Sequence, residues 1–550
     1  MKRLLFACLL MALAACSGQS GPIRAPCPAG QLCFETGNGP DPVSLDPNIA
    51  SGGTWETRIL TDLMIGLTTD DPNGDVMPGM ATSWETSPDG LTWTFHLREA
   101  KWSDGAPVTA DDFVYSMQRI MDPKTAAEYA SILYFIKNAQ AVNQGKMPPT
   151  AMGAKAVDAH TLVITLEHPA PYILEVAKHQ TMAPIPKHAV LKWGDAWSKP
   201  EHYVSNGPYL LKSWRLGDRI HVERNPYFYD NSNVCLDQVD YFVVLDPASG
   251  ERRTRTGELD NLTDGVVASN RIANMRRPGQ IPDYVRVHTY LGSGYLAFNT
   301  TLPKFKDKRV RNALSMTIDR DFITKKLLRG GQLTAYTFVP PGVANYIQAP
   351  KPYWADWTFE QRKTEARKLL AAAGYGPKNP LKVEIKHRNS SDPTLFMPAV
   401  QADWKSIGVD VTLIAYEVQI AYQAYKNADF EIADAGWIGD YNDAMTFLYL
   451  MQSQTGANNY GQYKNPAYDA LLLKADNEPD VAKRAEYLRQ AEIMMQNDQP
   501  VATIWYSINK NLVNPRVTGW VDNINDHHPT RFLCYKGAQT PAQKAASKSK

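Results

Sequence analysis

Apolar and polar residues alternate in several stretches of the chain, a pattern typical of half-buried β-strands. The clearest stretch follows the turn signal Asp89-Gly90, where every second residue of 91–97 is apolar and the residues between are polar. Successive side chains of a strand point to opposite faces, so this pattern predicts a strand with one buried face. Less regular versions predict further strands in three segments, residues 161–166, 239–245 and 409–413.

Capping residues and a helical spacing of apolar residues predict two helices with defined ends. Thr358 and Gln361 form a capping box, and Gly374 supplies the C-terminal stop. Asp480 can cap a second helix, in which apolar residues recur at intervals of three and four positions. Its predicted buried face carries Ala485, Leu488, Ala491 and Met495. Strands and helices are interspersed along the chain, which favours α/β architecture.

Residues 1–16 have the features of a lipoprotein signal peptide. Two positive residues precede an apolar run at 4–13 that is too short to cross a membrane, which takes about 20 residues. Leu13-Ala14-Ala15-Cys16 then reads as a lipobox, in which Cys16 becomes the lipid-bearing first residue. The alternative is a plain secretory signal with an incidental cysteine. Residues 17–34 would tether the body to a membrane on the periplasmic side, and residues 537–550 would form a disordered tail.

Composition narrows the class of protein further. The 550 residues are 44% hydrophobic and 21% charged, which is ordinary for a globular protein, and the length predicts two or three domains. The formal net charge is only +1, so a nucleic-acid partner has no electrostatic support. No run after the signal reaches about 18 apolar residues, so we expect membrane contact through the lipid alone.

Four of the six cysteines remain once the signal peptide and Cys16 are set aside. An exported chain meets an oxidising compartment, where an even number favours disulfides, and four cysteines allow three pairings. Cys27 and Cys33 are close enough to close a small loop, which leaves Cys235 for Cys534, and we favour this pairing. A zinc site is the alternative, but the spacings are not Cys-x-x-Cys and no histidine cluster accompanies them.

Short motifs occur in a characteristic order along most of the chain. They include Ser44-Leu45-Asp46-Pro47, Trp93-Thr94-Phe95-His96-Leu97-Arg98, Lys101-Trp102-Ser103-Asp104-Gly105, Ser205-Asn206-Gly207-Pro208-Tyr209, Ile318-Asp319-Arg320, Ala435-Gly436-Trp437 and Asp440-Tyr441-Asn442. In this order and spacing they resemble the peptide- and oligopeptide-binding family of ABC transporter solute-binding proteins. The resemblance covers residues 35–536.

The resemblance implies an α/β, two-lobed periplasmic-binding-protein fold with three domains, one of them inserted, and a ligand cleft between the lobes. The implied boundaries are 35–64 plus 187–291 plus 508–536 for a discontinuous domain I, 65–186 for the inserted domain II, and 292–507 for domain III. Two crossings, near residues 291 and 507, would join the lobes. Cys235 and Cys534 then share a domain, which supports their pairing.

The resemblance also implies a function, the capture of short peptides outside the cytoplasm for an inner-membrane ABC permease, with no catalysis and no cofactor. We expect a monomer. A peptide has a solvated backbone, and each polar group buried without a partner costs about 1–3 kcal/mol. The cleft must therefore offer strand edges to the ligand backbone, as in β-strand addition, and a carboxylate to its ammonium group.

Asp440 falls on the family position for the carboxylate that holds the α-ammonium group of the ligand. The alternative is that Asp440 caps a helix starting near Asp443. Gly436 and Trp437 would present backbone groups to the peptide. Other residues expected to line the pocket are Tyr129, Tyr295, Tyr441, Tyr506, Ser51 and Gly53. For Tyr129 and Tyr295, a core ring with a satisfied hydroxyl is an equally good interpretation.

The chain departs from the family at the far end of the ligand. Enteric members use basic side chains there to help bind the ligand carboxylate, whereas the corresponding positions here are Thr394, Tyr425 and Asp434. The ligand carboxylate would then be bound otherwise, lie near solvent or be missing. The cationic or titratable residues near enough in sequence to substitute are Lys426, His387 and Arg388. A solvated surface position is the better interpretation of each.

Other functions fit parts of the sequence. The same fold could carry a non-standard or non-peptide solute, such as a murein peptide, an opine, a glutathione-like molecule or a metal chelate. An exported hydrolase would need a nucleophile with a base, or a metal cluster, and the sequence has no Gly-x-Ser-x-Gly, His-Glu-x-x-His or P-loop motif. The adjacent pair His527-His528 is expected at the surface. A receptor that reports peptide to a membrane partner is the last alternative, and no signalling module supports it.

Overall fold

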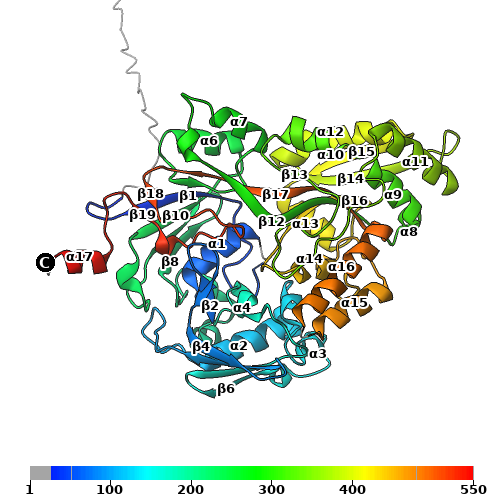
Figure 1. Cartoon of the computed structure of the whole chain (residues 1–550). Helices are drawn as coiled ribbons and strands as arrows, with labels where there is room; N and C mark the ends of the chain where they lie inside the picture. The colour runs from blue at the N-terminus through cyan, green and yellow to red at the C-terminus, as the bar shows by residue number, and fades with distance from the viewer. Residues whose placement is uncertain (1–26, 51–52, 479, 549–550) are drawn as a thin grey trace, which may run out of the picture.

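The computed structural model describes residues 27–50, 53–478 and 480–548. The predicted signal peptide, the lipobox at Cys16, most of the tether and Ser51 lie outside these residues. In the described part of the chain, no helix is both long and apolar enough to cross a membrane. Figure 1 shows a broad sheet across the upper part of the molecule and a smaller sheet at its lower edge.

Eleven strands form a mixed sheet that spans the molecule. Its order is β15-β14-β16-β12-β17-β11-β1-β10-β9-β8, and β13 also pairs with β17. The strands are β1 (Cys33–Gly39), β8 (Tyr209–Arg215), β9 (Arg219–Arg224), β10 (Gln238–Val243), β11 (Asn261–Leu262), β12 (Val285–Phe298), β13 (Leu333–Thr334), β14 (Leu381–Arg388), β15 (Val409–Tyr416), β16 (Ile432–Ile438) and β17 (Val501–Val513). Parallel pairs such as β14 with β15 occur beside antiparallel pairs such as β12 with β17.

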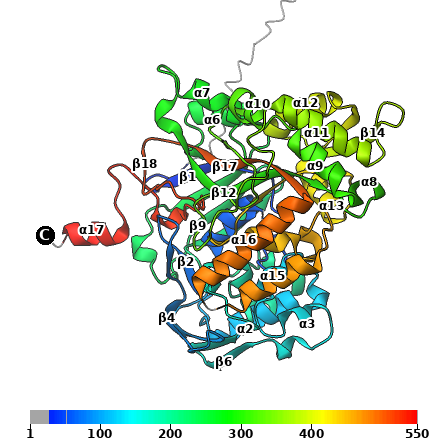
Figure 2. The ribbon, with the colours of Figure 1, turned by 45° about the vertical axis from the view of Figure 1, so that its right-hand side comes forward.

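The long strands β12 and β17 run through the middle of this sheet (Figure 1 and Figure 2). Their register is broken between Thr289 and Ser293, opposite Ile508 and Tyr506. On one side of the break β17 also pairs with β11, and on the other side β12 also pairs with β16. The break lies where the sequence predicts the two crossings between lobes.

The smaller sheet has the strand order β4-β5-β7-β6. Its strands are β4 (Ala81–Thr86), β5 (Thr92–Leu97), β6 (Ala154–Asp158) and β7 (Thr161–Thr165). Helix α2 (Ala110–Met121) packs against this sheet, and its first turn is closed by a capping box between Thr109 and Asp112. The remaining strand pairs are β2 (Thr68–Asp70) with β3 (Val76–Pro78), and β18 (Val517–Thr518) with β19 (Cys534–Tyr535).

Two hydrophobic cores lie on opposite faces of β16. Ile432 and Ala433 are consecutive in this strand, and their side chains belong to different cores. Helices α11 (Phe359–Ala372) and α12 (Ser391–Lys405) supply one core, for example with Trp404, while α13 (Val418–Lys426) and α16 (Val481–Asp498) supply the other, for example with Leu488. Further α-helices are α1 (Thr54–Leu63), α3 (Ala139–Asn143), α4 (Ile173–Val176), α5 (Lys187–Trp193), α6 (Pro247–Arg255), α7 (Ile272–Met275), α8 (Pro303–Lys306), α9 (Lys308–Met316), α10 (Arg320–Phe322), α14 (Met445–Leu448) and α15 (Pro466–Asp476).

The strands and helices predicted from the sequence are confirmed, with small shifts at their ends. β5, β7, β10 and β15 occupy the four predicted strand segments. Thr358 and Gln361 form the capping box of α11, and Asp480 accepts hydrogen bonds from two first-turn amides of α16. The predicted apolar face of α16 is buried. The favoured disulfides, Cys27–Cys33 and Cys235–Cys534, are both present.

The C-terminal tail differs from the prediction of disorder. Residues Pro541–Lys548 form helix α17, which lies at the edge of the molecule in Figure 1. Thr540 and Gln543 exchange hydrogen bonds across its first turn, and the segment is rich in alanine, the best helix former. Local capping and propensity therefore act in a segment that composition alone assigns to disorder.

Candidate functional site

A cavity of about 970 Å³ is lined by residues of strands β1, β11, β12, β16 and β17. Helices α1, α12 and α13 begin at its wall. The wall therefore combines chain segments from both sides of the break in β12 and β17. Its volume lies at the upper end of the range of small-molecule sites, about 300–1,000 Å³.

Asp440 is the second residue after the end of β16 and places its carboxylate in the cavity wall. Its side chain is 12% exposed. The Tyr129 hydroxyl donates a hydrogen bond to Oδ2, and Thr446 Oγ1 lies 3.5 Å from the same oxygen. Oδ1 lies 4.0 Å from His179 Nε2. Among the described residues, no Lys or Arg side chain forms an ion pair with this carboxylate.

The neighbours of Asp440 leave its charge uncompensated. Burial raises the pKa of Asp440 to about 7, and the hydrogen bond from Tyr129 and the electrostatic effect of His527 act in the opposite direction. Burial also raises the pKa of Tyr129 well above its ordinary value, so this hydroxyl keeps its proton and donates. Burial lowers the pKa of His179 to about 3, so the imidazole is neutral at physiological pH. The cavity thus holds a buried carboxylate that no Lys or Arg among the described residues contacts.

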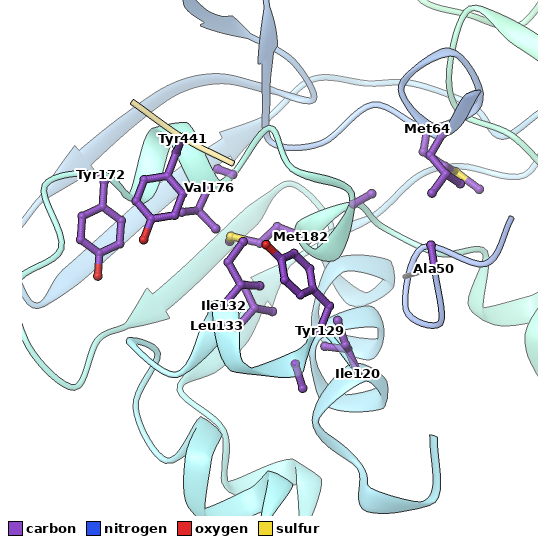
Figure 3. Packing of buried hydrophobic residues seen from close by; sticks show 14 of the residues in the cluster. Ala50, Met64, Ile120, Tyr129, Ile132, Leu133, Tyr172, Val176, Met182 and Tyr441 are labelled. Carbon is purple, nitrogen blue, oxygen red and sulfur yellow. The ribbon is translucent and has the colours of Figure 1, made fainter. Parts of the chain in front are cut away.

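Aromatic rings surround this carboxylate. The ring of Tyr129 lies 5.5 Å from His179 and 6.4 Å from Trp437, and Trp437 lies 6.0 Å from Tyr449, measured between centroids. The indole Nε1 of Trp437 is buried and has no acceptor among the described residues. Tyr129 belongs to the buried cluster drawn in Figure 3. The wall near Asp440 is therefore rich in aromatic rings and offers an unused donor.

Strand β16 presents a free edge to the cavity. Its partner β14 pairs only with Ile432 and Ala433, at the start of the strand. From Ala435 to Asp440 the chain lines the cavity instead, and its other edge stays paired with β12 as far as Ile438. Along the described residues, the β14 side of this stretch has no strand neighbour. Such an edge can accept an extended backbone by β-strand addition.

Five of the residues predicted for the site lie together in the cavity wall: Asp440, Trp437, Gly436, Tyr129 and Gly53. The alternative interpretation, in which Asp440 caps the helix near Asp443, does not hold. The first amide of α14, Met445 N, donates instead to Asp443 Oδ1 at 2.9 Å. The alternative for Tyr129, a core ring with a satisfied hydroxyl, is compatible with the wall position, since its partner is Asp440 itself.

Three predicted tyrosines lie outside the wall. Tyr295 is fully buried against Phe338, with ring centroids 5.1 Å apart, and does not reach the cavity wall. Tyr441 is buried, and its ring stacks on that of Tyr172 with centroids 4.9 Å apart. Figure 3 shows the two rings as neighbours. Tyr506 is hydrogen bonded to Thr337, and its neighbour Trp505 lines the cavity in its place.

The far end of the site is not the solvated surface that the sequence suggested. Arg388 lines the cavity and lies 2.8 Å from buried Asp434. Burial alone would lower the pKa of Arg388, but Asp434 raises it well above the ordinary value. His387 is buried behind the wall, and Lys426 lines the cavity in an ion pair with Glu128. Of the three positions that depart from the family, Thr394 is exposed, whereas Tyr425 and Asp434 are buried outside the wall.

Several wall residues were missed by sequence reasoning. His527 and His528 were expected at the surface, but both line the cavity, with ring nitrogens 3.1 Å from Asp70 and from Asp526. Arg58 and Lys510 also line it. No local pattern predicts these positions, because the wall brings Arg58 of α1 together with residues close to the C-terminal end of the chain. In the described part of the chain, no group of three or more His, Cys, Asp or Glu side chains is arranged to hold a metal ion.

Comparisons with known proteins agree with this architecture. The family model for bacterial extracellular solute-binding proteins, family 5 Middle, matches residues 75–459. The chain is 38% identical over 537 residues to the periplasmic oligopeptide-binding protein OppA of Salmonella typhimurium, covering 95% of this chain and 97% of that protein. The structure of Haemophilus influenzae OppA in complex with RPPGFSPFR superposes with a TM-score of 0.87 at 34% identity, covering 92% of this chain and 99% of that one.

Two structures of the murein tripeptide-binding protein MppA indicate which state of the cleft is present. The Escherichia coli MppA structure superposes with a TM-score of 0.87 at 36% identity, covering 92% of this chain and 99% of that one. An unliganded open form of MppA gives a TM-score of only 0.68, with 35% identity and coverage of 92% and 98%. The lobes of this chain are thus arranged as in the more closely superposing structures. The predicted two-lobed α/β fold is confirmed, and the chain belongs to family 5 of the bacterial extracellular solute-binding proteins.

Proposed function

We propose that this protein captures short peptides outside the cytoplasm for an inner-membrane ABC importer, and that Asp440 holds the peptide amino terminus. The observation that carries the proposal is the buried carboxylate without a cation. An ammonium group beside it would supply the missing charge in a site of low dielectric, where such a pair is stronger than in water. OppA of Salmonella typhimurium, a relative over nearly the whole chain, is an oligopeptide-binding protein.

The free edge of β16 supports the same proposal. A peptide laid along Ala435–Asp440 would exchange backbone hydrogen bonds with the strand, so its main chain would lose little on leaving water. Such bonds do not depend on the ligand sequence. Gly436 and Trp437 would supply the edge, while the rest of the cavity leaves room for side chains and bridging waters.

The proposal also includes the division of the chain into lobes and its attachment to a membrane. Residues 35–64, 187–291 and 508–536 would form one lobe with the inserted segment 65–186, and 292–507 would form the other. A lipid on Cys16 would keep the monomer at a membrane, facing the permease. Cys16→Ser should then release the protein from the membrane fraction. Retention of the variant there would contradict the anchor without affecting the binding proposal.

A non-standard solute in the same cleft is the second candidate. One observation favours it, the absence of cationic side chains at Thr394, Tyr425 and Asp434. A relative by structure, MppA of Escherichia coli, is a murein tripeptide-binding protein. An exported hydrolase has no comparable support, since the relatives named above are binding proteins.

Mass spectrometry of ligand that co-purifies with the native protein tests the proposed function. We expect peptides with free amino termini to be released on denaturation of the wild type and to be depleted in Asp440→Asn. A ligand without a primary amine, recovered equally from both proteins, would contradict the proposal and favour the second candidate.

A further inference from the structure

The cations that line the described cavity wall already have carboxylate partners within the protein. They are Arg58, Arg388, Lys426 and Lys510, together with the imidazoles of His527 and His528, which lie 3.1 Å from Asp70 and Asp526 respectively. Arg58 Nη2 lies 3.0 Å from Asp526 Oδ2. Lys510 Nζ lies 3.5 Å from Asp264 and 3.6 Å from Asp392, and all of these carboxylates also line the cavity. These two cations are therefore neutralised at the wall itself.

The two cations on the other lobe are neutralised as well. Arg388 forms two contacts with Asp434, at 2.8 and 3.2 Å, and donates a hydrogen bond to the Tyr422 hydroxyl. Asp434 is only 1% exposed, so it has no access to water in place of Arg388. Lys426 is paired with Glu128, whose side chain is 43% exposed. Diverting Arg388 to a ligand would leave a buried charge without a partner, which is strongly unfavourable.

Helix N-termini at the wall are occupied too. A helix N-terminus can bind an anionic group through its free amides. Here α1 carries Glu56 in a capping box, α12 carries Asp392 in its first turn, and α13 is capped by Glu417, which accepts from two amides. A ligand carboxylate would therefore meet fixed negative charge at each of these three positions.

We propose that the cleft selects peptides by their free amino terminus alone and binds them equally well whether or not their carboxyl end is charged. The inference rests on the proposed function, since it takes Asp440 as the site of the ligand ammonium. Its substrates would include peptides with an amidated or otherwise neutral end, and peptides long enough for the carboxylate to lie outside the cavity. The inference is based on the distribution of charge in the wall. Asp440 has no Lys or Arg partner, whereas each described Lys and Arg of the wall is paired with a carboxylate.

End-modified peptides test this inference directly. The full-length protein, freed of ligand, is equilibrated with an equimolar library of tri- to pentapeptides, each present with free ends, with an N-acetyl group, with a C-terminal amide, and with both modifications. The bound fraction is quantified by mass spectrometry. Free and amidated forms should be recovered within about threefold of each other, and N-acetylated forms should be depleted more than about tenfold, or ~1.4 kcal/mol.

The outcomes separate the inference from the proposed function. Depletion of the amidated forms by about tenfold or more would overturn the inference while peptide binding stands. Recovery of no library member in any form would contradict the proposed function, and the inference with it. Equal recovery of the N-acetylated forms would remove Asp440 as the anchor.

Variants that release a cation provide the positive test. Asp434→Asn leaves Arg388 without its partner, and Glu128→Gln does the same for Lys426 at an exposed side chain, where folding is not at risk. Each should create a preference for free acids over amides of about tenfold. Asp410→Asn, which removes an exposed carboxylate outside the wall without releasing a cation, should keep the wild-type ratio. Wild-type ratios in both releasing variants would overturn the inference.

Discussion

The carboxylate of Asp440 is buried among neutral groups, so a bound cation would stabilise its charged form. Its carboxylate is nearly enclosed, and the groups that contact it, Tyr129, Thr446 and His179, are all neutral. A buried carboxylate of this kind destabilises the empty protein, and binding sites commonly retain such strain where a ligand removes it. The same residue therefore limits the stability of the empty cleft and supplies the affinity of the loaded one.

Replacing Asp440 should separate binding from folding. Asp440→Asn keeps the shape and removes the charge, so affinity for a peptide with a free amino terminus should fall by about 2 kcal/mol or more, roughly 30-fold. Titration calorimetry measures this change. Glu417→Gln, at an exposed wall carboxylate, is the matched control and should bind within about threefold of the wild type. Equal losses in both variants would point to general charge and not to a specific contact.

The pH dependence of binding follows from the pKa of Asp440, which burial raises to about 7. A bound ammonium lowers that pKa, so binding below about pH 7 must release a proton. Affinity should therefore fall, by up to tenfold per pH unit, as the pH drops from about 7 to 5, and should level off between about 7 and 8, where the ligand amine begins to titrate. Calorimetry in buffers of different ionisation enthalpy detects the released proton. An affinity unchanged between pH 5 and 7 would exclude this linkage.

The raised pKa of Asp440 should also make the stability of the ligand-free protein depend on pH. The pKa of an unfolded Asp is about 3.9, so the folded state retains the proton of Asp440 up to about pH 7 and the unfolded state does not. The free energy of unfolding of the empty protein should thus decrease as the pH rises from about 4 to 7. Asp440→Asn should be at least as stable as the wild type at pH 8 by thermal melting. A less stable variant would mean that the carboxylate is compensated in the empty protein.

The sequence identified some of these residues and not others, for physical reasons. Asp440, Gly436 and Trp437 lie in one continuous motif at the end of a strand, so a local string is enough to find them. Tyr295 was assigned to the pocket, but it is buried against Phe338, a distant residue in the sequence that no local motif reveals. The sequence did not reveal that Arg388 is paired within the protein, because its partner Asp434 lies 46 residues away.

At the scale of elements, the edge of β16 is the feature that positions a ligand. Periodicity predicted β5, β7 and β15 well, because each has a buried face or an apolar run bounded by turn signals. It did not predict β16 or the sheet order. The neighbour of a strand is set by long-range pairing, and the free edge exists only because β14 stops pairing after Ala433.

A side chain added at this edge should block the ligand and spare the fold. A Cβ at Gly436 would meet only the Ser293 carbonyl oxygen within 4 Å, at 3.5 Å, whereas one at Gly439 would meet Leu291 and Thr446 below 3.0 Å. Gly436→Val should therefore melt within a few degrees of the wild type and lose at least about tenfold in peptide affinity, because a strand partner must approach closely. Gly439→Val is the contrasting variant, expected to lose stability. Unchanged affinity in Gly436→Val would place the ligand elsewhere.

At the scale of the molecule, the lobes meet through contacts between residues distant in sequence. Tyr129 with Asp440, Glu128 with Lys426, and Asp41 with Gln419 are each about 300 or more residues apart. The two-lobed architecture was available from the resemblance of ordered motifs. The path of β12 and β17, with its register break near residue 291, required the structure.

Removing the ligand should open the molecule. The closed cavity leaves Asp440 buried without a cation, so the empty protein should favour a state in which Tyr129 and Asp440 are separated and hydrated. Small-angle scattering should give a larger radius of gyration for stripped protein than for the peptide complex. Asp440→Asn, without the charge, should be more compact than the stripped wild type. Identical scattering curves with and without peptide would contradict this coupling.

The most direct test of the proposed role of Asp440 as the site of the peptide amino terminus is a crystal structure of the protein with a bound peptide. We expect the α-amino nitrogen of the ligand to lie at hydrogen-bond distance from Asp440, about 2.7–2.9 Å, with the ligand backbone along Ala435–Asp440. A bound ligand whose amino group lies elsewhere, with Asp440 still contacting only Tyr129, Thr446 and His179, would contradict it.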